Sequence, residues 1–472
     1  MKLRSFILLL IGILPSLLQA KVFYDSPQTD LSQYFAEEGA TYVIKYKHTD
    51  TRQITIPAKS TIVFEGGCLE ATLQFNLTLL KGDVKLQGSN IAGSLRNKVF
   101  DAKWLCYADG KQDDAKAINM IFALAHKVFF PKGTYLLTSF HSPLYPINKP
   151  YHLGINHSDV SITGEEGATL LTRTKAGTLC IYSKPYALKE SVEKITIEGL
   201  TFKVANEDTS FDPYQEHCHT ISFIGVKGAT VKNCQFKNYW GDAICLNHYN
   251  DNENTGERTR NMKVVIENNL IDGYKHSNRN GISVISGENI LIRGNQLKNC
   301  SHSKMPGAID IEPNSHVFTI NNIRIIGNTI DACQGNNAAI SVVSNKRQGP
   351  IHNVLIRDNR ITNSTRGLEF AVECDDVADE VKVENNFVDE NTDPYIFYGK
   401  GKSKNWSFKG NIFKRASKWK LGGEIKIFNL KTSKNQIKGM AWNMSPRPFL
   451  YVSTVVLALI LTFVAFFRKF YH

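Results

Sequence analysis

A short pattern recurs in the second half of the chain and limits the possible folds more than any other feature. Each copy has apolar residues at alternate positions, followed by a turn with one asparagine in a fixed column. These asparagines are Asn269, Asn295, Asn328, Asn359, Asn386 and Asn411, spaced 25 to 33 residues apart. Weaker copies precede them at 195–202 and 230–236, and Cys234 takes the asparagine column in the second. A strand that recurs once per coil of about thirty residues predicts a solenoid whose coils pair with their neighbours.

A second family of strands interleaves with the first. Its members are GDAICLN (241–247), NGISVIS (280–286), GAIDIEP (307–313), AAISVVS (338–344) and GLEFAV (367–372). Alternation with a period of two predicts strands that turn Ile, Val and Leu inward. Inward asparagines at the turns can hydrogen-bond their copies in adjacent coils, so we expect a ladder. Cys300 and Cys333 share a column, and we expect stacked core thiols there rather than a disulfide.

Together these repeats resemble the right-handed parallel β-helix proteins of the pectate lyase-like superfamily, over roughly residues 50–413. The segment DGKQDDAKAINMIFALAHKVFFPKGTYLL (109–137) resembles the entry module of such β-helices and of phage tailspikes. The resemblance implies a short amphipathic helix, capped by Asp113 or Asp114, that plugs the open end of the solenoid. Its expected inward residues are Ala117, Ile118, Ile121, Phe122 and Ala125. Because this fold hosts lyases, hydrolases, epimerases and inert adhesins, the resemblance does not select an activity.

Both ends of the chain carry targeting features. Lys2 and Arg4 precede an apolar run that closes at Ala20, which is typical of a secretory signal. Residues 449–467 are apolar and uncharged, long enough as a helix to cover close to the ~30 Å bilayer core. We therefore expect an exported body, periplasmic or on the cell surface, that is anchored by one C-terminal transmembrane helix.

Charge is distributed unevenly along the chain. The net charge is +12, yet residues 400–447 hold thirteen Lys or Arg against Glu424 alone, which leaves residues 21–399 about four charges negative. This layout argues against a nucleic-acid partner, and it fits either contact with acidic lipid headgroups or a solvated face. The expected all-β organisation is a signal at 1–20, an N-terminal β segment at 21–100, the β-helix at 101–413, a basic juxtamembrane segment at 414–448, a transmembrane helix at 449–467 and a cytoplasmic tail at 468–472.

The stretch GAIDIEPN (307–314) contains the candidate catalytic acids. With Ile309 and Ile311 in the core, Asp310 and Glu312 should point outward. Glu369 falls in the column of Asp310 two coils away, together with Cys245, Ser283 and Ser341. The Cα atoms of Asp310 and Glu312 should be about 6.6 Å apart, and those of Asp310 and Glu369 about 9.6 Å. The sequence thus predicts outward catalytic residues at Asp310, Glu312 and Glu369.

Two chemistries remain open for these acids. They could bracket a water and a glycosidic oxygen, as in inverting hydrolysis, where carboxyl groups lie ~6.5–9.5 Å apart. They could instead hold a Ca²⁺ that neutralises a uronate, and a lyase would then need a base. The nearby candidates for a base are His248, His302, Lys304 and Arg366; the expected substrate-binding residues are Asn247, His248, Lys304 and Arg366. Exposed acids that only confer solubility are the plain alternative.

Other motifs narrow the function only a little. The chain lacks the paired adjacent Asp, Gly-His-Gly and Arg-x-Lys motifs of polygalacturonases and the Asp-Pro-His-Asp pattern of alginate epimerases. His217 and His219 flank Cys218, but three residues on one short strand cannot all face one ion, so no metal site is predicted. We expect an exported, membrane-anchored β-helix that acts on polysaccharide as a lyase or glycoside hydrolase. The alternative is a non-catalytic glycan- or protein-binding β-helix, either adhesin-like or a degenerate enzyme.

Overall fold

A computed structural model describes residues 21–140, 150–183, 191–205, 216–248, 260–273, 278–302, 307–334, 338–345, 348–373, 378–399, 401–415, 426–437 and 440–443. The expected signal (1–20), transmembrane helix (449–467) and cytoplasmic tail (468–472) lie outside these ranges, as does Lys304. Within these ranges, no helix has both the length and the apolar character needed to cross a membrane.

The chain divides into two compact units, of which the first is formed by residues up to Cys106 together with Ala123–Ala125. Its strands are mutually parallel and pair in the order β1-β2-β4-β5, with β3 and β6 also on β5. Their bounds are β1 (Val22–Tyr24), β2 (Thr41–Ile44), β3 (Lys47–Thr55), β4 (Thr61–Phe64), β5 (Cys68–Gly82), β6 (Asn90–Leu95) and β7 (Phe100–Asp101), with the short helices α2 (Leu31–Tyr34) and η1 (Ala102–Trp104).

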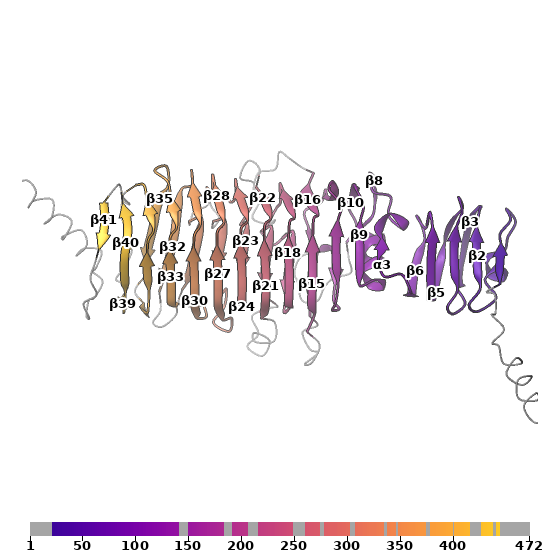
Figure 1. Ribbon diagram of the computed structural model, residues 1–472, viewed down its shortest axis with the longest axis horizontal. Coiled ribbons are helices and arrows are strands. Elements are labelled where there is room, and N and C mark those ends of the chain that lie inside the picture. Colours follow the sequence, from indigo (N-terminus) through magenta and orange to yellow (C-terminus); the bar gives the residue numbers. More distant parts are fainter. Residues whose placement is uncertain are drawn as a thin grey trace, which may run out of the picture. The chain divides into compact units, whose positions relative to one another are not determined.

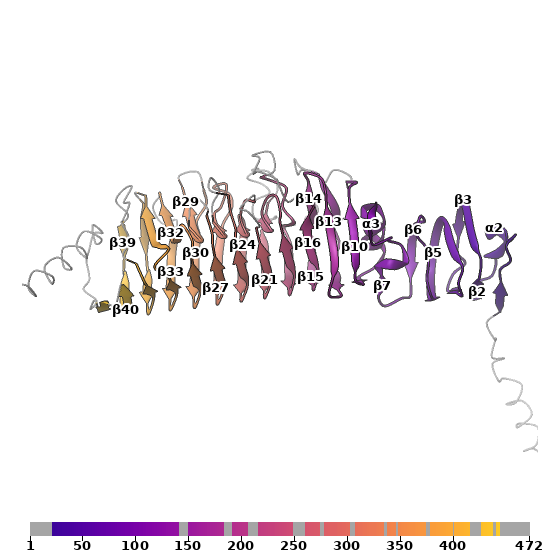
Figure 2. The same cartoon turned by 90° about the horizontal axis from the view of Figure 1, so that it is seen from above.

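The second unit stacks coils of three parallel strands, and Figures 1 and 2 show successive coils side by side. One row holds β9 (Lys127–Phe130), β12 (Ser161–Gly164), β15 (Glu193–Glu198), β18 (Lys227–Lys232), β21 (Asn261–Glu267), β24 (Gly287–Arg293), β27 (Ile320–Ile326), β30 (Ile351–Arg357), β33 (Ala378–Glu384), β37 (Ser407–Lys409) and β40 (Lys431–Ile437). The next holds β8 (Asp109–Asp113), β10 (Gly133–Leu137), β13 (Ala168–Thr172), β16 (Thr201–Val204), β19 (Gln235–Lys237), β22 (Leu270–Asp272), β25 (Gln296–Lys298), β28 (Thr329–Asp331), β31 (Arg360–Thr362), β34 (Phe387–Val388) and β38 (Ile412–Phe413).

The third row is a nine-stranded sheet that contains the predicted acids. It comprises β11 (Tyr151–Ile155), β14 (Gly177–Tyr182), β17 (Ile221–Ile224), β20 (Ile244–Asn247), β23 (Ile282–Val284), β26 (Ile309–Ile311), β29 (Ile340–Ser344), β32 (Arg366–Val372) and β35 (Asp393–Tyr398). One apolar column, buried throughout, runs through Ile244, Ile282, Ile309, Ile340 and Leu368. This column faces the core, as the period-two pattern predicted.

The predicted asparagine ladder is confirmed. In each rung the side-chain oxygen of one asparagine accepts from both the backbone N–H and the side-chain amide of its neighbour, from Asn269 through Asn411. Cys234 begins the ladder by donating its backbone N–H to Asn269 Oδ1 at 2.9 Å. Because every ladder asparagine is buried, each of these bonds offsets the cost of placing an amide in the core.

The solenoid also runs past residue 413, where the sequence analysis ended it. Asn435 adds one more rung to Asn411, at 3.0 and 2.9 Å, and β40 pairs with β37 and β38. Near this end, β41 (Met440–Asn443) runs antiparallel to β40, and β39 (Lys426–Phe428) pairs with β36 (Lys402–Lys404). Strand pairing thus continues beyond residue 413, and the exposed Lys431 and Lys434 mask the alternating pattern of this later strand in the sequence.

The predicted capping helix is α3 (Ala115–Leu124), and Asp113 accepts from the N–H of Ala115 at 3.3 Å. Its inward face buries Ile118, Ile121 and Phe122. Asn119 donates to His152 O at 2.8 Å and accepts from Gly154 N at 3.0 Å. Both partners belong to β11, the first strand of the nine-stranded sheet, so α3 satisfies backbone groups at the edge of this sheet.

Eight cysteines lie in the described ranges, and no disulfide joins any two of them. Cys333 Sγ lies 3.2 Å from the backbone oxygen of Cys300, so the two residues are stacked without a disulfide, as predicted.

Candidate functional site

The predicted outward column of the nine-stranded sheet is confirmed in register. Strand pairing aligns Cys245 with Ser283, Ser283 with Asp310, Asp310 with Ser341, and Ser341 with Glu369. Asp310 and Glu369 are therefore two coils apart, about 9.6 Å at a strand spacing of about 4.8 Å. The alternation of Ile309 and Ile311 with the acids was sufficient to predict this alignment.

The expected exposure of this column was wrong. Asp310 is only 3% exposed and Glu369 only 2%, whereas Glu312 is half-buried. Asn280, which precedes β23, contacts the Asp310 carboxyl group from the adjacent coil. Two of the three acids are thus buried, and a strand pattern carries no information about the side chains that bury them.

The surroundings of Asp310 favour the protonated form of its carboxyl group over the charged form. Its Oδ2 accepts from Asn280 Nδ2 at 3.2 Å, and no described residue donates a hydrogen bond to its buried Oδ1. Burial, reinforced by the nearby charge of Glu312, raises the pKa of Asp310 well above its usual range. A buried carboxylic acid with one oxygen free of protein partners can donate a proton to a bound group.

The other two predicted acids have different environments. Glu312 accepts from Gln348 Nε2 at 2.6 Å and keeps part of its side chain accessible. Glu369 accepts from Ser341 Oγ at 3.3 Å and is buried. The structure therefore brings the buried Asp310 together with the half-buried Glu312. Glu369 lies two coils away from Asp310 in the same column.

A buried ion pair, which the sequence analysis missed, adjoins Asp310. Arg279 Nη1 lies 3.1 and 2.9 Å from the two carboxylate oxygens of Asp242, and both residues are at most 9% exposed. The backbone N–H of Asn280 donates to Asp242 Oδ1 at 3.0 Å, so Asn280 bridges Asp242 and Asp310. Although burial opposes it, Arg279 holds the pKa of Asp242 below its usual value. Arg279 Nε lies 3.3 Å from the half-exposed Glu216 Oε1, as an ion pair.

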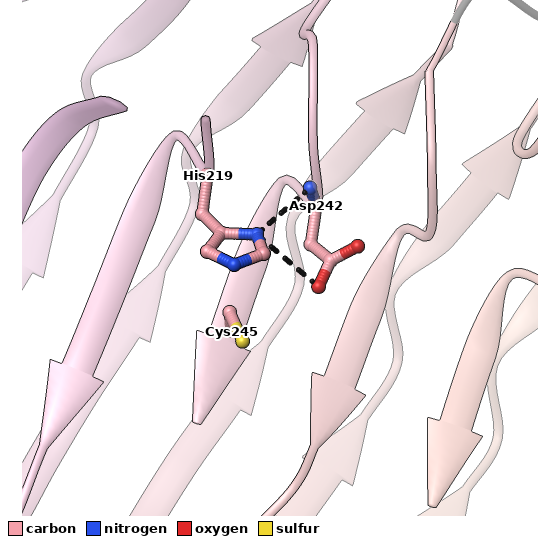
Figure 3. Close-up of side chains that lie close together, drawn as sticks. All are labelled: His219, Asp242 and Cys245. Carbon is pink, nitrogen blue, oxygen red and sulfur yellow. Dashed lines mark hydrogen bonds and ion pairs between the residues drawn. The ribbon is translucent and has the colours of Figure 1, made fainter. Parts of the chain in front are cut away.

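His219 and Cys245 complete this region. His219 Nδ1 lies 3.2 Å from Asp242 N and 3.3 Å from Asp242 Oδ2, and burial lowers the pKa of His219 to about 4. The ring is therefore neutral at pH 7, and Nδ1 accepts from the backbone N–H of Asp242. Figure 3 shows both contacts, with Cys245 beside them.

The expected substrate-binding residues are only partly assembled. Asn247 Nδ2 donates to Ser222 Oγ at 3.4 Å, and the ring of the next residue, His248, lies 3.9 Å from that of Phe318. Arg366 begins β32, half-buried, in register with Asp393. Asn247 and Glu312 each follow directly after residues in one aligned column, so they lie two coils apart at the same end of the sheet.

The described acids do not supply the set of ligands that Ca²⁺ would need in the lyase alternative. Ca²⁺ takes six to eight oxygen ligands, several of them ionised carboxylates. Burial disfavours the charged form of Asp310, and Glu369 is buried and accepts a hydrogen bond from Ser341. These side chains therefore do not form a Ca²⁺ site.

The family described as right handed beta helix region matches residues 219–438. Those residues contain the whole ladder, from Cys234 to Asn435, and all three predicted acids. The chain is a right-handed parallel β-helix protein. This agrees with the predicted pectate lyase-like resemblance. No curated protein matches the β-helix in sequence.

Several solved structures share the architecture of this β-helix at low identity. An α-1,3-glucanase catalytic unit from Streptomyces thermodiastaticus is 14% identical, over 90% of this chain and 70% of its own, with a TM-score of 0.44. The adhesin PfbA of Streptococcus pneumoniae is 14% identical, over 72% and 98%, with a TM-score of 0.43. An ι-carrageenase bound to carrageenan fragments is 10% identical, over 75% and 93%, with a TM-score of 0.43. At these scores the likenesses carry no argument about activity.

Proposed function

We propose that this β-helix acts on a glycan and cleaves it by acid–base catalysis at Asp310 and Glu312. The observation that carries the proposal is the buried Asp310, whose pKa is raised by burial and whose Oδ1 has no hydrogen-bond partner among the described residues, two positions from the half-buried Glu312. Two neighbouring carboxyl groups in different protonation states are what glycoside hydrolysis needs.

In this mechanism Asp310 donates its proton to the glycosidic oxygen as the carbon–oxygen bond breaks. Glu312 accepts a proton from the water that attacks the sugar carbon. The products are one new reducing end and one free hydroxyl group, and proton exchange with solvent restores Asp310 and Glu312. Gln348, which donates to Glu312, positions this carboxylate.

One observation favours the alternative of a non-catalytic glycan-binding β-helix. Asp310, Asp242 and Glu369 are each at most 3% exposed, and fully buried polar groups often have a structural role. In that case the accessible polar side chains at the strand ends, Asn247, His248 and Glu312, would supply the binding surface.

Incubation of the full chain with a panel of acidic and neutral polysaccharides tests the proposal. New reducing ends without an unsaturated product support hydrolysis. Unsaturated uronate, detected by ultraviolet absorbance, would replace hydrolysis by elimination. Retention on a polysaccharide without any new ends would overturn catalysis in favour of binding.

The location of the protein is a second part of the proposal. We infer export and anchoring from the signal-like residues 1–20 and the apolar run 449–467. A polysaccharide outside the cell would then be the accessible substrate.

A further inference from the structure

Three different metal-binding groups converge in the nine-stranded sheet. His219, Asp242 and Cys245 place one ligand atom each within 4.8 Å of one another, and all three side chains are buried. Figure 3 shows them on two neighbouring coils, with His219 before β17, Asp242 before β20 and Cys245 on β20. The sequence pattern around His217 and Cys218 did not reveal this set, because two of its three members lie one coil further along the chain.

The spacing suits a tetrahedral ion. His219 Nδ1 and Asp242 Oδ2 lie 3.3 Å apart. Ligands held about 2.0–2.1 Å from a Zn²⁺ ion span a tetrahedral edge of about 3.3–3.4 Å. All three ligand atoms lie within 4.8 Å of one another. Cys245 Sγ would therefore have to move by about 1 Å to form a sulfur–zinc bond of about 2.3 Å. Coordination would exchange the 3.2 Å hydrogen bond from Asp242 N to His219 Nδ1 for a bond to the metal.

The surrounding residues orient the carboxylate for this purpose. A carboxylate offers about four lone-pair positions. Arg279 occupies one on each oxygen of Asp242, and the Asn280 N–H takes the other on Oδ1. Oδ2 of Asp242 faces His219, 3.3 Å from its Nδ1. Hydrogen-bonded carboxylates of this kind are the usual outer support of metal ligands.

Charge balance favours a divalent ion. Asp242 and Glu216 carry two negative charges against the single positive charge of Arg279. Cys245 carries a thiol proton, and its sulfur lies within 4.8 Å of an Asp242 oxygen. Replacing that proton by a divalent ion would leave a thiolate and bring the five groups to neutrality.

We propose that His219, Asp242 and Cys245 bind one divalent transition-metal ion of the Zn²⁺ type. The sulfur and imidazole ligands exclude Ca²⁺ and Mg²⁺, which take oxygen. On binding, the Cys245 thiol releases its proton to solvent as the sulfur–metal bond forms. Because the ligands come from two coils and are buried, the ion would lock these coils together.

Cobalt titration of the full, untagged chain, after removal of metals with a chelator, tests this site. We expect one Co²⁺ per chain, a thiolate-to-cobalt charge-transfer absorption, and one proton released per ion into weakly buffered solution. Zn²⁺ should displace the cobalt and abolish the absorption. Cys245→Ser should lose the absorption, and His219→Gln should weaken binding at least tenfold.

Cys300→Ser is the matched control, since Cys300 is another buried free thiol of the same solenoid. It should keep both the absorption and the stoichiometry. Failure of the wild-type chain to bind cobalt stoichiometrically would overturn the proposal, whether or not the variants fold. An absorption that survives Cys245→Ser would also overturn it. No glycan is present in this experiment, so its failure is distinguishable from failure of the proposed catalysis.

Discussion

Asn328 Oδ1 accepts two hydrogen bonds from Asn295, one from its backbone N–H at 2.9 Å and one from its side-chain amide at 3.0 Å. One oxygen therefore satisfies two buried donors of the preceding coil. In Asn328→Leu both donors lose their partner, and we expect the free energy of unfolding to fall by about 1–3 kcal/mol. Denaturant unfolding measures this loss. Asn391→Leu, at an exposed position, should change it by less than about 0.5 kcal/mol. Equal stabilities for the two variants would refute the role of the ladder.

Removal of either acid should abolish glycan cleavage. Asp310→Asn deletes the proton donor and Glu312→Gln deletes the base, so we expect kcat to fall by about 10²–10⁴-fold in each. Initial rates on whichever polysaccharide the wild-type chain cleaves provide the measurement. Glu380→Gln, at an exposed position on β33, should retain full activity. Unimpaired turnover in Asp310→Asn would remove this residue from the mechanism.

The protonation of Asp310 should make stability depend on pH. Its pKa is raised in the folded state, so the folded chain binds a proton that the unfolded chain has lost above pH 3.8. Stability from this group is therefore complete below pH 3.8 and declines as the pH rises toward the folded-state pKa, by at most about 1.4 kcal/mol per pH unit. Unfolding of the wild-type chain and of Asp310→Asn between pH 4 and 7, approximately, isolates the effect. Parallel pH profiles for the two proteins would show that Asp310 is ionised in the fold.

The buried ion pair makes a prediction that needs two variants. Arg279→Met leaves the Asp242 carboxylate buried without its cation, and we expect a loss of about 3–5 kcal/mol in unfolding free energy. Adding Asp242→Leu should recover part of this loss, because the uncompensated charge is then gone. Thermal or denaturant unfolding of the single and double variants decides the matter. A double variant less stable than the single one by the full cost of a second substitution would show no coupling between the two residues.

The membrane topology of the chain can be tested in intact spheroplasts. If the body is exported and residues 449–467 span the membrane, added protease should digest the β-helix while a tag after His472 stays protected. Permeabilised cells provide the control, in which the tag should also be lost. A protected β-helix with an accessible tag would reverse the proposed orientation.

The sequence predicted the register of the fold far better than the environment of the site. Alternation places Ile309 in the core whatever surrounds the coil, so the alignment of Asp310 with Glu369 followed directly. Burial of Asp310 depends instead on Asn280, thirty residues away, which covers it from the preceding coil. Such tertiary contacts leave no periodic trace in a sequence.

The pair formed by Asp242 and Arg279 could have been found from the same alignment. Pairing of Ile244 with Ile282 sets Asp242 opposite Asn280, with Arg279 adjacent. Opposite charges on aligned positions just before two core strands are uncommon. An alignment of the residues that precede the strands therefore predicts this ion pair.

In the asparagine ladder, the length of the chain between rungs is independent of the hydrogen-bond geometry of the rungs. Successive rungs lie 26, 33, 31, 27, 25 and 24 residues apart, yet their hydrogen bonds stay between 2.9 and 3.0 Å. Extra residues are therefore absorbed between strands, without disturbing the rungs themselves. Proteins with this architecture can lengthen or shorten the loops of one coil while the strands of every other coil keep their register. Recognition could then diversify at nearly constant stability, in the way that antibody loops vary on an unchanged framework.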